Sequence, residues 1–135
     1  MALMTWNSTL STGVKVMDEQ HKGLVNSLND LHEAMLKGQD KAATGALLAT
    51  LVKYTREHFA AEEALLKRTA YPELAAQVSK HRDLTAQVDG FVQRYQRGEI
   101  AVNVGLLMFL RDWLATHIQK EDRDYGPWLN RHGVQ

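Results

Sequence analysis

The residues whose types and spacing could do chemistry lie in the stretch Glu57-His58-Phe59-Ala60-Ala61-Glu62-Glu63. His58 and Glu62 are four residues apart, so on an α-helix they lie about 40° apart on one face. An imidazole and a carboxylate in that relation can bind one metal ion together. An isolated pair at this spacing is more often a simple contact on a solvated helix face. The interpretation therefore depends on whether other segments supply further ligands.

The composition limits which ligands and partners are available. A chain of 135 residues with 44% hydrophobic and 24% charged residues fits one globular domain, residues 1–135. Sixteen basic residues balance sixteen acidic ones without a block of like charge, so we expect neither nucleic acid nor a membrane as a partner. The chain has no cysteine, which excludes disulfides and thiolate-ligated zinc or iron–sulfur sites. Any metal must bind through nitrogen and oxygen.

The start of the chain does not resemble a targeting segment. Residues 1–10 contain no basic stretch followed by an apolar one, and the chain has no run of about 18 apolar residues. We expect a soluble, cytoplasmic protein that acts as a monomer.

Apolar residues recur at helical spacing in four segments, at about 18–37, 40–69, 72–97 and 103–125, after an arm over residues 1–17. Asp18 is a candidate N-cap for the first helix and Asn103 for the fourth. Gly38 and Gly98 are suited to end helices, and Gly126-Pro127 is expected to end the last one. Short connections favour antiparallel neighbours, so the predicted fold is all-α: an up-down-up-down antiparallel four-helix bundle with an extended N-terminal arm.

Each predicted helix carries a possible ligand on its inward face: His21, then His58 and Glu62, then His81, then His117, with Asp122 further along. A single inward histidine is more often a hydrogen-bonded core residue, but four histidines with two carboxylates are better explained by shared metal coordination. This donor set suits iron, manganese or zinc, and bridging carboxylates indicate a dinuclear site. The sequence contains no Glu-x-x-His, which disfavours the ferritin-like di-iron arrangement.

The spacing of His117 and Asp122 does not fit a regular helix. Five residues separate them, which places their side chains about 140° apart. We expect this helix to be distorted or unwound there, or Asp122 to reach the site from the helix end.

A set of motifs runs through nearly the whole chain: Trp6-Asn7, Asp18-Glu19-Gln20-His21, His58-Phe59-Ala60-Ala61-Glu62-Glu63, Tyr71-Pro72, His81, Trp113-Leu114-Ala115-Thr116-His117 and Asp122. In order and spacing this set resembles the hemerythrin family, specifically the bacterial single-domain hemerythrins, or bacteriohemerythrins. The resemblance implies a four-helix bundle that holds two non-haem iron ions with an oxo or hydroxo bridge. It further implies reversible O2 binding for oxygen storage, delivery or sensing, with an oxygen-consuming enzyme as a conceivable partner.

The resemblance also implies roles for particular residues. According to this resemblance, His21 and His58 would bind the iron that keeps an open position for O2. His81 and His117 would bind the other iron. Glu62 and Asp122 would bridge the two. The residues that match pocket positions of the family are Leu24, Phe59, Trp113 and Leu114. For each of these four, ordinary core packing is the alternative interpretation.

The sequence departs from the family pattern at Gln77, where the family usually has a histidine four residues before His81. Gln77 lies one turn before His81, so its amide oxygen could coordinate weakly or hold a coordinating water. It could also be a polar residue beside an altered site. We expect a binding protein and no enzyme. A di-iron peroxidase or oxidase that uses this altered position, or a metal-binding bundle without O2 chemistry, remains an alternative.

Three further residues near these motifs have chemically active side chains. Glu57 and Glu63 flank the central motif, and we expect them to face water or to pair with Lys53 and Lys67 at helical spacing. Tyr125 follows Asp122 by three residues; packing is the expected role, with a hydrogen bond near the site as the alternative.

Overall fold

The computed structural model describes residues 3–99 and 104–135, except for the side chains of residues 104 and 120–123. The described residues form helices and no strand. The elements are a short 3-10 turn η1 (Ser8–Leu10), the helices α1 (Lys15–Leu36), α2 (Lys41–Arg68), α3 (Leu74–Gln96) and α4 (Val104–Thr116), a π-helical segment η2 (His117–Asp122) and a final helix α5 (Arg123–Arg131). Within these ranges, no helix has the length and apolar character needed to cross a membrane.

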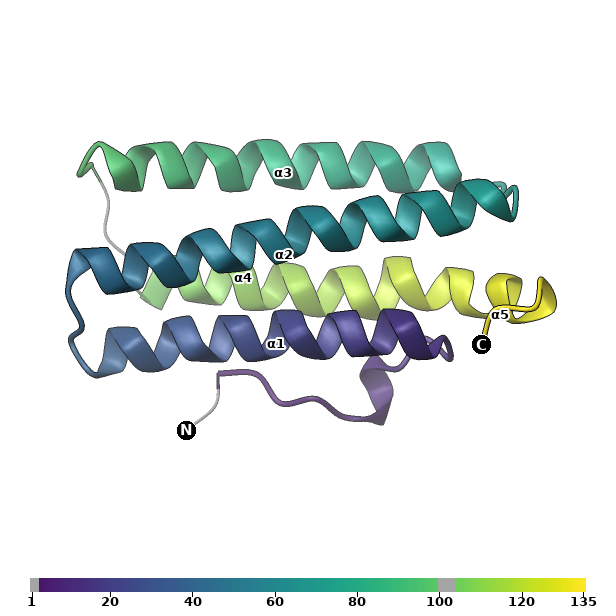
Figure 1. The fold of residues 1–135 in the computed structure, drawn as a ribbon, viewed down its shortest axis with the longest axis horizontal. Helices are drawn as coiled ribbons and strands as arrows, with labels where there is room; N and C mark the ends of the chain where they lie inside the picture. Colours follow the sequence, from purple (N-terminus) through teal and green to yellow (C-terminus); the bar gives the residue numbers. More distant parts are fainter. Residues whose placement is uncertain (1–2, 100–103) are drawn as a thin grey trace.

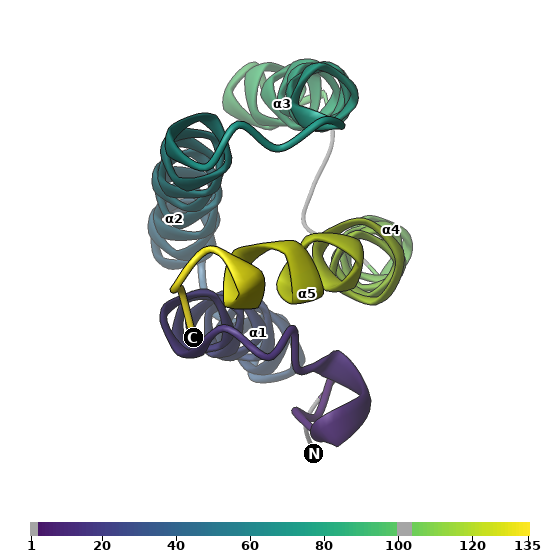
Figure 2. The same cartoon turned by 90° about the vertical axis from the view of Figure 1, so that its right-hand side faces the viewer.

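The long helices α1 to α4 lie side by side and alternate in direction (Figure 1). Viewed along the bundle, they occupy separate corners, and α5 runs from the end of α4 across toward α1 (Figure 2). The prediction of an all-α antiparallel bundle with an N-terminal arm is confirmed. Gly38 and Gly98 follow the ends of α1 and α3 with φ of +67° and +75°, a conformation that glycine adopts without strain.

Two apolar clusters fill the bundle. The larger one holds Leu24, Phe59, Leu84 and Leu114 together with most of the other buried apolar residues. The smaller one, near α5, consists of Val14, Met17, Leu66, Tyr125 and Leu129. On α1, α2 and the last helical stretch, the histidines and Glu62 fall in sequence between residues of the two clusters. The polar residues therefore form a layer with apolar packing on both sides.

The N-terminal arm is fastened along α1 by side-chain hydrogen bonds. Asn29 accepts from the Met4 backbone N–H at 2.9 Å and donates to the Met4 carbonyl at 2.7 Å. Asp18 accepts from the Ser11 hydroxyl at 2.6 Å and from the Thr12 N–H at 2.8 Å. The prediction that Asp18 is the N-cap is wrong: α1 begins at Lys15, and Asp18 lies in its first turn. Its carboxylate binds the arm instead of the end of the helix.

The last helical stretch continues beyond its predicted end. The predicted end lies near residue 125, before Gly126-Pro127, whereas α5 extends through Pro127 to Arg131. Tyr125 and Leu129 are fully buried in the smaller cluster, and their spacing places them on one helix face. Their burial compensates for the hydrogen bond that proline cannot donate. Asn103, the predicted N-cap of this stretch, lies outside the described residues.

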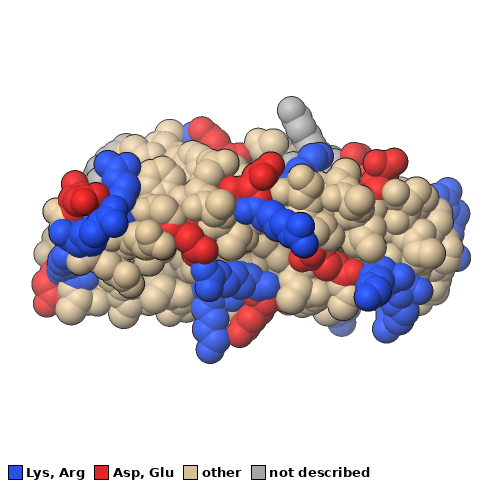
Figure 3. All heavy atoms as spheres, turned by 90° about the horizontal axis from the view of Figure 1, so that it is seen from above, with Lys and Arg blue, Asp and Glu red and all other residues tan. Residues whose placement is uncertain are grey.

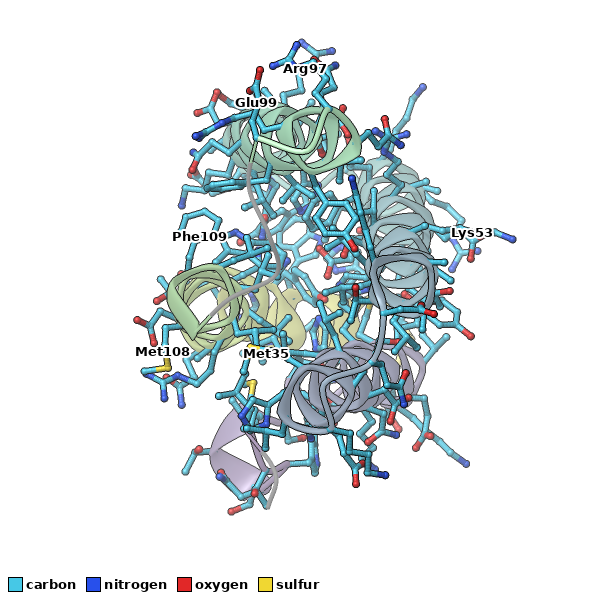
Figure 4. The ribbon with its side chains drawn as sticks, turned by 90° about the vertical axis from the view of Figure 1, so that its left-hand side faces the viewer. Met35, Lys53, Arg97, Glu99, Met108 and Phe109 are labelled. Atoms are coloured by element: carbon cyan, nitrogen blue, oxygen red, sulfur yellow. The ribbon has the colours of Figure 1, made fainter. Side chains whose placement is uncertain are left out.

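Charged side chains of both signs cover one face of the molecule. On the face above α3, positive and negative side chains alternate (Figure 3). Figure 4 views the bundle from the end opposite to that in Figure 2. In this view, Lys53 extends from α2 away from the bundle, whereas Phe109 lies between α4 and α3. Its ring packs against Phe91 with 5.3 Å between centroids, which joins α3 to α4 outside the polar layer.

Gly126 permits a close approach between the arm and α5. A Cβ at this position would lie 1.9 Å from the Thr12 carbonyl oxygen. We expect Gly126→Ala to lower the free energy of unfolding by about 1–3 kcal/mol, because the arm must move. Urea denaturation measures this. Gly90, in α3, is the matched control because a Cβ there meets nothing within 4 Å; Gly90→Ala should stabilise the protein by up to about 1 kcal/mol. Equal effects of the two substitutions would contradict this packing.

Candidate metal centre

Four imidazoles from different parts of the chain meet inside the bundle. His21 comes from α1, His58 from α2, His81 from α3 and His117 from the first position of η2. Their exposed fractions are between 0% and 3%. Neighbouring rings lie close together, with centroids 4.5 Å apart for His21 and His58 and 5.3 Å apart for His81 and His117. The structure therefore brings together the four histidines that the sequence analysis selected.

Glu62 lies among all four imidazoles and is 1% exposed. Its Oε1 atom pairs with His58 Nε2 and lies 3.3 Å from His21 Nε2 and 3.7 Å from His117 Nε2. Its Oε2 atom lies 3.3 Å from His81 Nε2. One carboxylate thus directs its two oxygens toward different histidines, an arrangement that suits a bridge between two cations.

A π-helical segment begins at His117 and ends at Asp122. In a π-helix the backbone bonds join residues five apart, and such segments occur frequently at functional sites. This backbone brings positions 117 and 122 closer to one face than a regular α-helix would. The expectation that the helix is distorted between these two residues is confirmed. The side chain of Asp122 lies outside the described residues, so its role as a ligand stays a prediction.

Three residues hydrogen-bond to the imidazoles and to Glu62 from outside the cluster. The Nδ1–H of His58 donates to Gln20 Oε1 at 2.6 Å, and the Tyr125 hydroxyl donates to Glu62 Oε1 at 3.3 Å. The Nδ1–H of His81 donates to Glu63 Oε2 at 3.4 Å. Each imidazole so held presents its Nε2 atom to the interior.

These contacts extend two of the sequence interpretations. Glu63, predicted to face water or to pair with Lys67, has a side chain that is 33% exposed, and its carboxylate also reaches the ring of His81. Tyr125 packs in the core, as expected, and also hydrogen-bonds to Glu62. Gln20 was not selected as a functional residue, because its partner His58 lies on another helix and no local spacing joins the two.

The charge of Glu62 is stabilised by its neighbours. Burial alone raises the pKa of this carboxyl group. The adjacent His58 and hydrogen bonds from His117, His21 and His58 outweigh burial and hold the pKa of Glu62 well below its ordinary value. Glu62 is therefore ionised at neutral pH and can act as an anionic ligand.

Gln77 is buried on α3, one turn before His81. Its exposed fraction is 5%, close to that of the neighbouring imidazole. The side chain is thus inside the bundle at the height of the polar layer, as its spacing predicts. Whether it contacts a metal directly or through water stays a prediction.

The four predicted pocket residues lie in two different places. Leu24, Trp113 and Leu114 help to line an apolar cavity of about 20 Å³, completed by Leu28, Leu51, Thr55, Val88 and Leu110. Phe59 instead stacks on the His81 ring, with centroids 3.8 Å apart and planes 6° apart. Trp113 also stacks on His117, at 5.2 Å and 15°. The cavity and the two stacked rings all lie on the side of the larger cluster.

The donor atoms could hold metal ions. Nitrogen and oxygen donors of His21, His58, Glu62 and His117 all lie within 4.8 Å of one another. Glu62 Oε2 and His81 Nε2 have no hydrogen-bond partner among the described residues, although both are buried. Buried polar atoms without partners are costly, and coordination would satisfy them. Imidazole and carboxylate donors without thiolate suit non-haem iron.

Comparison with known proteins identifies the family. The family model "Hemerythrin HHE cation binding domain" matches residues 12–129. The chain belongs to the hemerythrin family. A bacteriohemerythrin of Methylococcus capsulatus is 35% identical over 131 residues, which are 96% of this chain and 99% of that one. One of Stenotrophomonas maltophilia is 36% identical over 98% of this chain and 85% of that protein.

The fold is also that of solved hemerythrins. A crystal structure of wild-type hemerythrin superposes with a TM-score of 0.90 at 35% identity, over 95% of this chain and 98% of that one. Hemerythrins bind O2 at a non-haem di-iron centre, and the buried histidine and glutamate cluster of this chain could hold such metal ions. The resemblance found in the sequence is confirmed.

Replacing Glu62 by Gln tests the central carboxylate. We expect bound iron to fall from two ions per chain to one or fewer, because the neutral amide cannot bridge two cations. The stabilisation by metal should shrink in parallel; for one site it is about 2.7 kcal/mol at a ligand concentration of 100 Kd. Metal analysis and thermal unfolding with and without iron measure both. Glu57→Gln, an exposed neighbour on α2, is the control, and equal iron content in both variants would contradict a bridging role.

Proposed function

We propose that this chain binds O2 reversibly at a non-haem di-iron centre and acts as a carrier, store or sensor of oxygen, not as an enzyme. One observation carries the proposal: the buried Glu62 carboxylate lies among four imidazoles. These imidazoles come from α1, α2, α3 and η2. Membership of the hemerythrin family supports the same conclusion.

In the proposed centre, His21 and His58 would hold one iron, the one that takes up O2, and His81 and His117 would hold the second. Glu62 and Asp122 would be shared by the two ions, and Gln77 would coordinate weakly or through water. The Glu62 oxygens support a bridging role, since Oε1 lies 3.3 Å from His21 Nε2 and Oε2 lies 3.3 Å from His81 Nε2. His117 Nε2 lies on the Oε1 side, at 3.7 Å. The π-helical backbone from His117 to Asp122 supports a second ligand from that segment.

Two ferrous ions would supply the electrons that reversible O2 binding requires. The surrounding side chains then have two tasks. Leu24, Trp113 and Leu114 line the apolar cavity and exclude water, which limits proton entry and irreversible oxidation. Gln20 and Glu63 hold His58 and His81 with Nε2 directed inward, and the stacked Phe59 and Trp113 rings restrict ring rotation.

The same proposal covers the oligomeric state, the location and the partner of the protein. The chain would act as a monomer in the cytoplasm and deliver oxygen to an oxygen-consuming enzyme. Positive and negative side chains are interspersed on the face that Figure 3 shows, which is not the pattern of a surface that binds a large polyanion.

Visible spectroscopy tests the proposed function directly. The protein is loaded with iron, reduced without oxygen, exposed to O2 and purged again. We expect a charge-transfer band that appears with O2 and disappears on purging. A band that persists after purging, or sustained consumption of peroxide with a reducing substrate, would contradict the carrier role and favour an enzyme.

Replacing Gln77 by His tests the ligand that departs from the family pattern. An imidazole is a stronger donor than an amide, so Gln77→His should retain iron longer, and its oxygen-dependent band should decay several-fold more slowly. Loss of iron to a chelator and decay of the band under air measure these rates. Gln93→His provides the control, since Gln93 is exposed on the same helix. Equal rates in Gln77→His and the original protein would show that Gln77 does not affect the centre.

A further inference from the structure

The ring of His81 is held between two side chains of α2. Phe59 stacks on the ring face with a centroid distance of 3.8 Å, and Glu63 Oε2 lies 3.4 Å from Nδ1. Phe59 and Glu63 are four residues apart on α2, so they lie on the same helix face, one turn apart. Together they determine both the plane of the ring and the nitrogen that carries the proton.

The corresponding contact of His58 is chemically different. Its Nδ1–H donates to Gln20, whose side chain is a neutral amide. At the proposed iron near His58, one imidazole therefore donates its Nδ1–H to an amide. At the proposed iron near His81, one imidazole donates its Nδ1–H to a carboxylate. The carboxylate is on the side of the centre where Gln77 stands in place of an imidazole.

A carboxylate that accepts from Nδ1–H makes the imidazole a stronger donor through Nε2. An amide such as Gln77 is a weaker donor than an imidazole. We propose that Glu63 is a positioning residue that compensates for Gln77, by orienting His81 and strengthening its bond to the second iron. This inference rests on the proposed di-iron function. The Glu63 side chain is 33% exposed, so solvent screens its long-range field, and the effect acts through the charge-assisted hydrogen bond to His81 Nδ1.

A double-mutant cycle tests the compensation. The proteins are the original chain, Glu63→Gln, Gln77→His and the double variant. The release of iron from each reduced protein to a ferrous chelator is followed under anaerobic conditions, and Co(II) binding is titrated by its visible absorption. Glu63→Gln should weaken one of the two metal sites of the original chain by about 10-fold or more. In the Gln77→His background the same substitution should have an effect of less than about 3-fold, since an additional imidazole then binds that ion.

Glu63→Gln retains the shape of the side chain and removes its charge, so a merely structural role would leave the affinities unchanged. The reduction potential gives a second readout: removing the carboxylate should raise it in the original chain more than in Gln77→His. Thermal unfolding of the metal-free proteins establishes that each variant is folded. Glu57→Gln removes an exposed charge of α2 that has no contact with His81 among the described side chains, and it should leave metal release unchanged.

The outcomes separate this inference from the function on which it rests. Equal effects of Glu63→Gln in both backgrounds, or no effect in the original chain, would overturn the compensation while the di-iron function stands. An original chain that binds fewer than two metal ions would overturn both. A large effect confined to the Gln77 background, with Glu57→Gln silent, supports the compensation.

Discussion

The structure depends on one electrostatic constraint: an ionised carboxylate, Glu62, is buried at the centre of the bundle. An isolated charge in such a place would be too costly to keep. The charge on His58 and the hydrogen bonds from His117, His21 and His58 hold the pKa of Glu62 well below its ordinary value, so it remains ionised despite its burial. Glu62 Oε2 and His81 Nε2 lie 3.3 Å apart, and neither has a hydrogen bond among the described residues. Cations bound between the imidazoles and the carboxylate would satisfy both atoms.

The rest of the fold maintains that polar layer. One apolar cluster packs on each side of it, which keeps the helices in register so that the ligands lie at one height. The arm and α5 close the end nearest Glu62, where Asp18 binds the arm to α1 and Gly126 lets α5 pass close to Thr12. The π-helical segment changes the angular spacing of the last ligand-bearing helix. This change begins at His117, which is the first residue of the segment. The polar layer is thereby covered by apolar packing on both sides.

Much of this could be predicted from the sequence. Hydrophobic spacing identified the long helices, and the inward positions of His21, His58, His81 and His117 followed from the same period. The poor angular match of His117 and Asp122 also predicted a distortion, which the π-helix provides. The roles of Asp18 and Pro127 could not be predicted, because tertiary contacts overrode local preferences. The same holds for Gln20 and Glu63: each contacts a histidine on a different helix, and a single sequence contains no spacing that joins them.

The most direct test of the central claim is an anomalous difference map of crystals of the iron-loaded protein, recorded at the iron absorption edge. The account predicts two peaks inside the bundle, both in contact with Glu62, one beside His21 and His58 and the other beside His81 and His117. A single peak, or two peaks that do not share the Glu62 carboxylate, would contradict it.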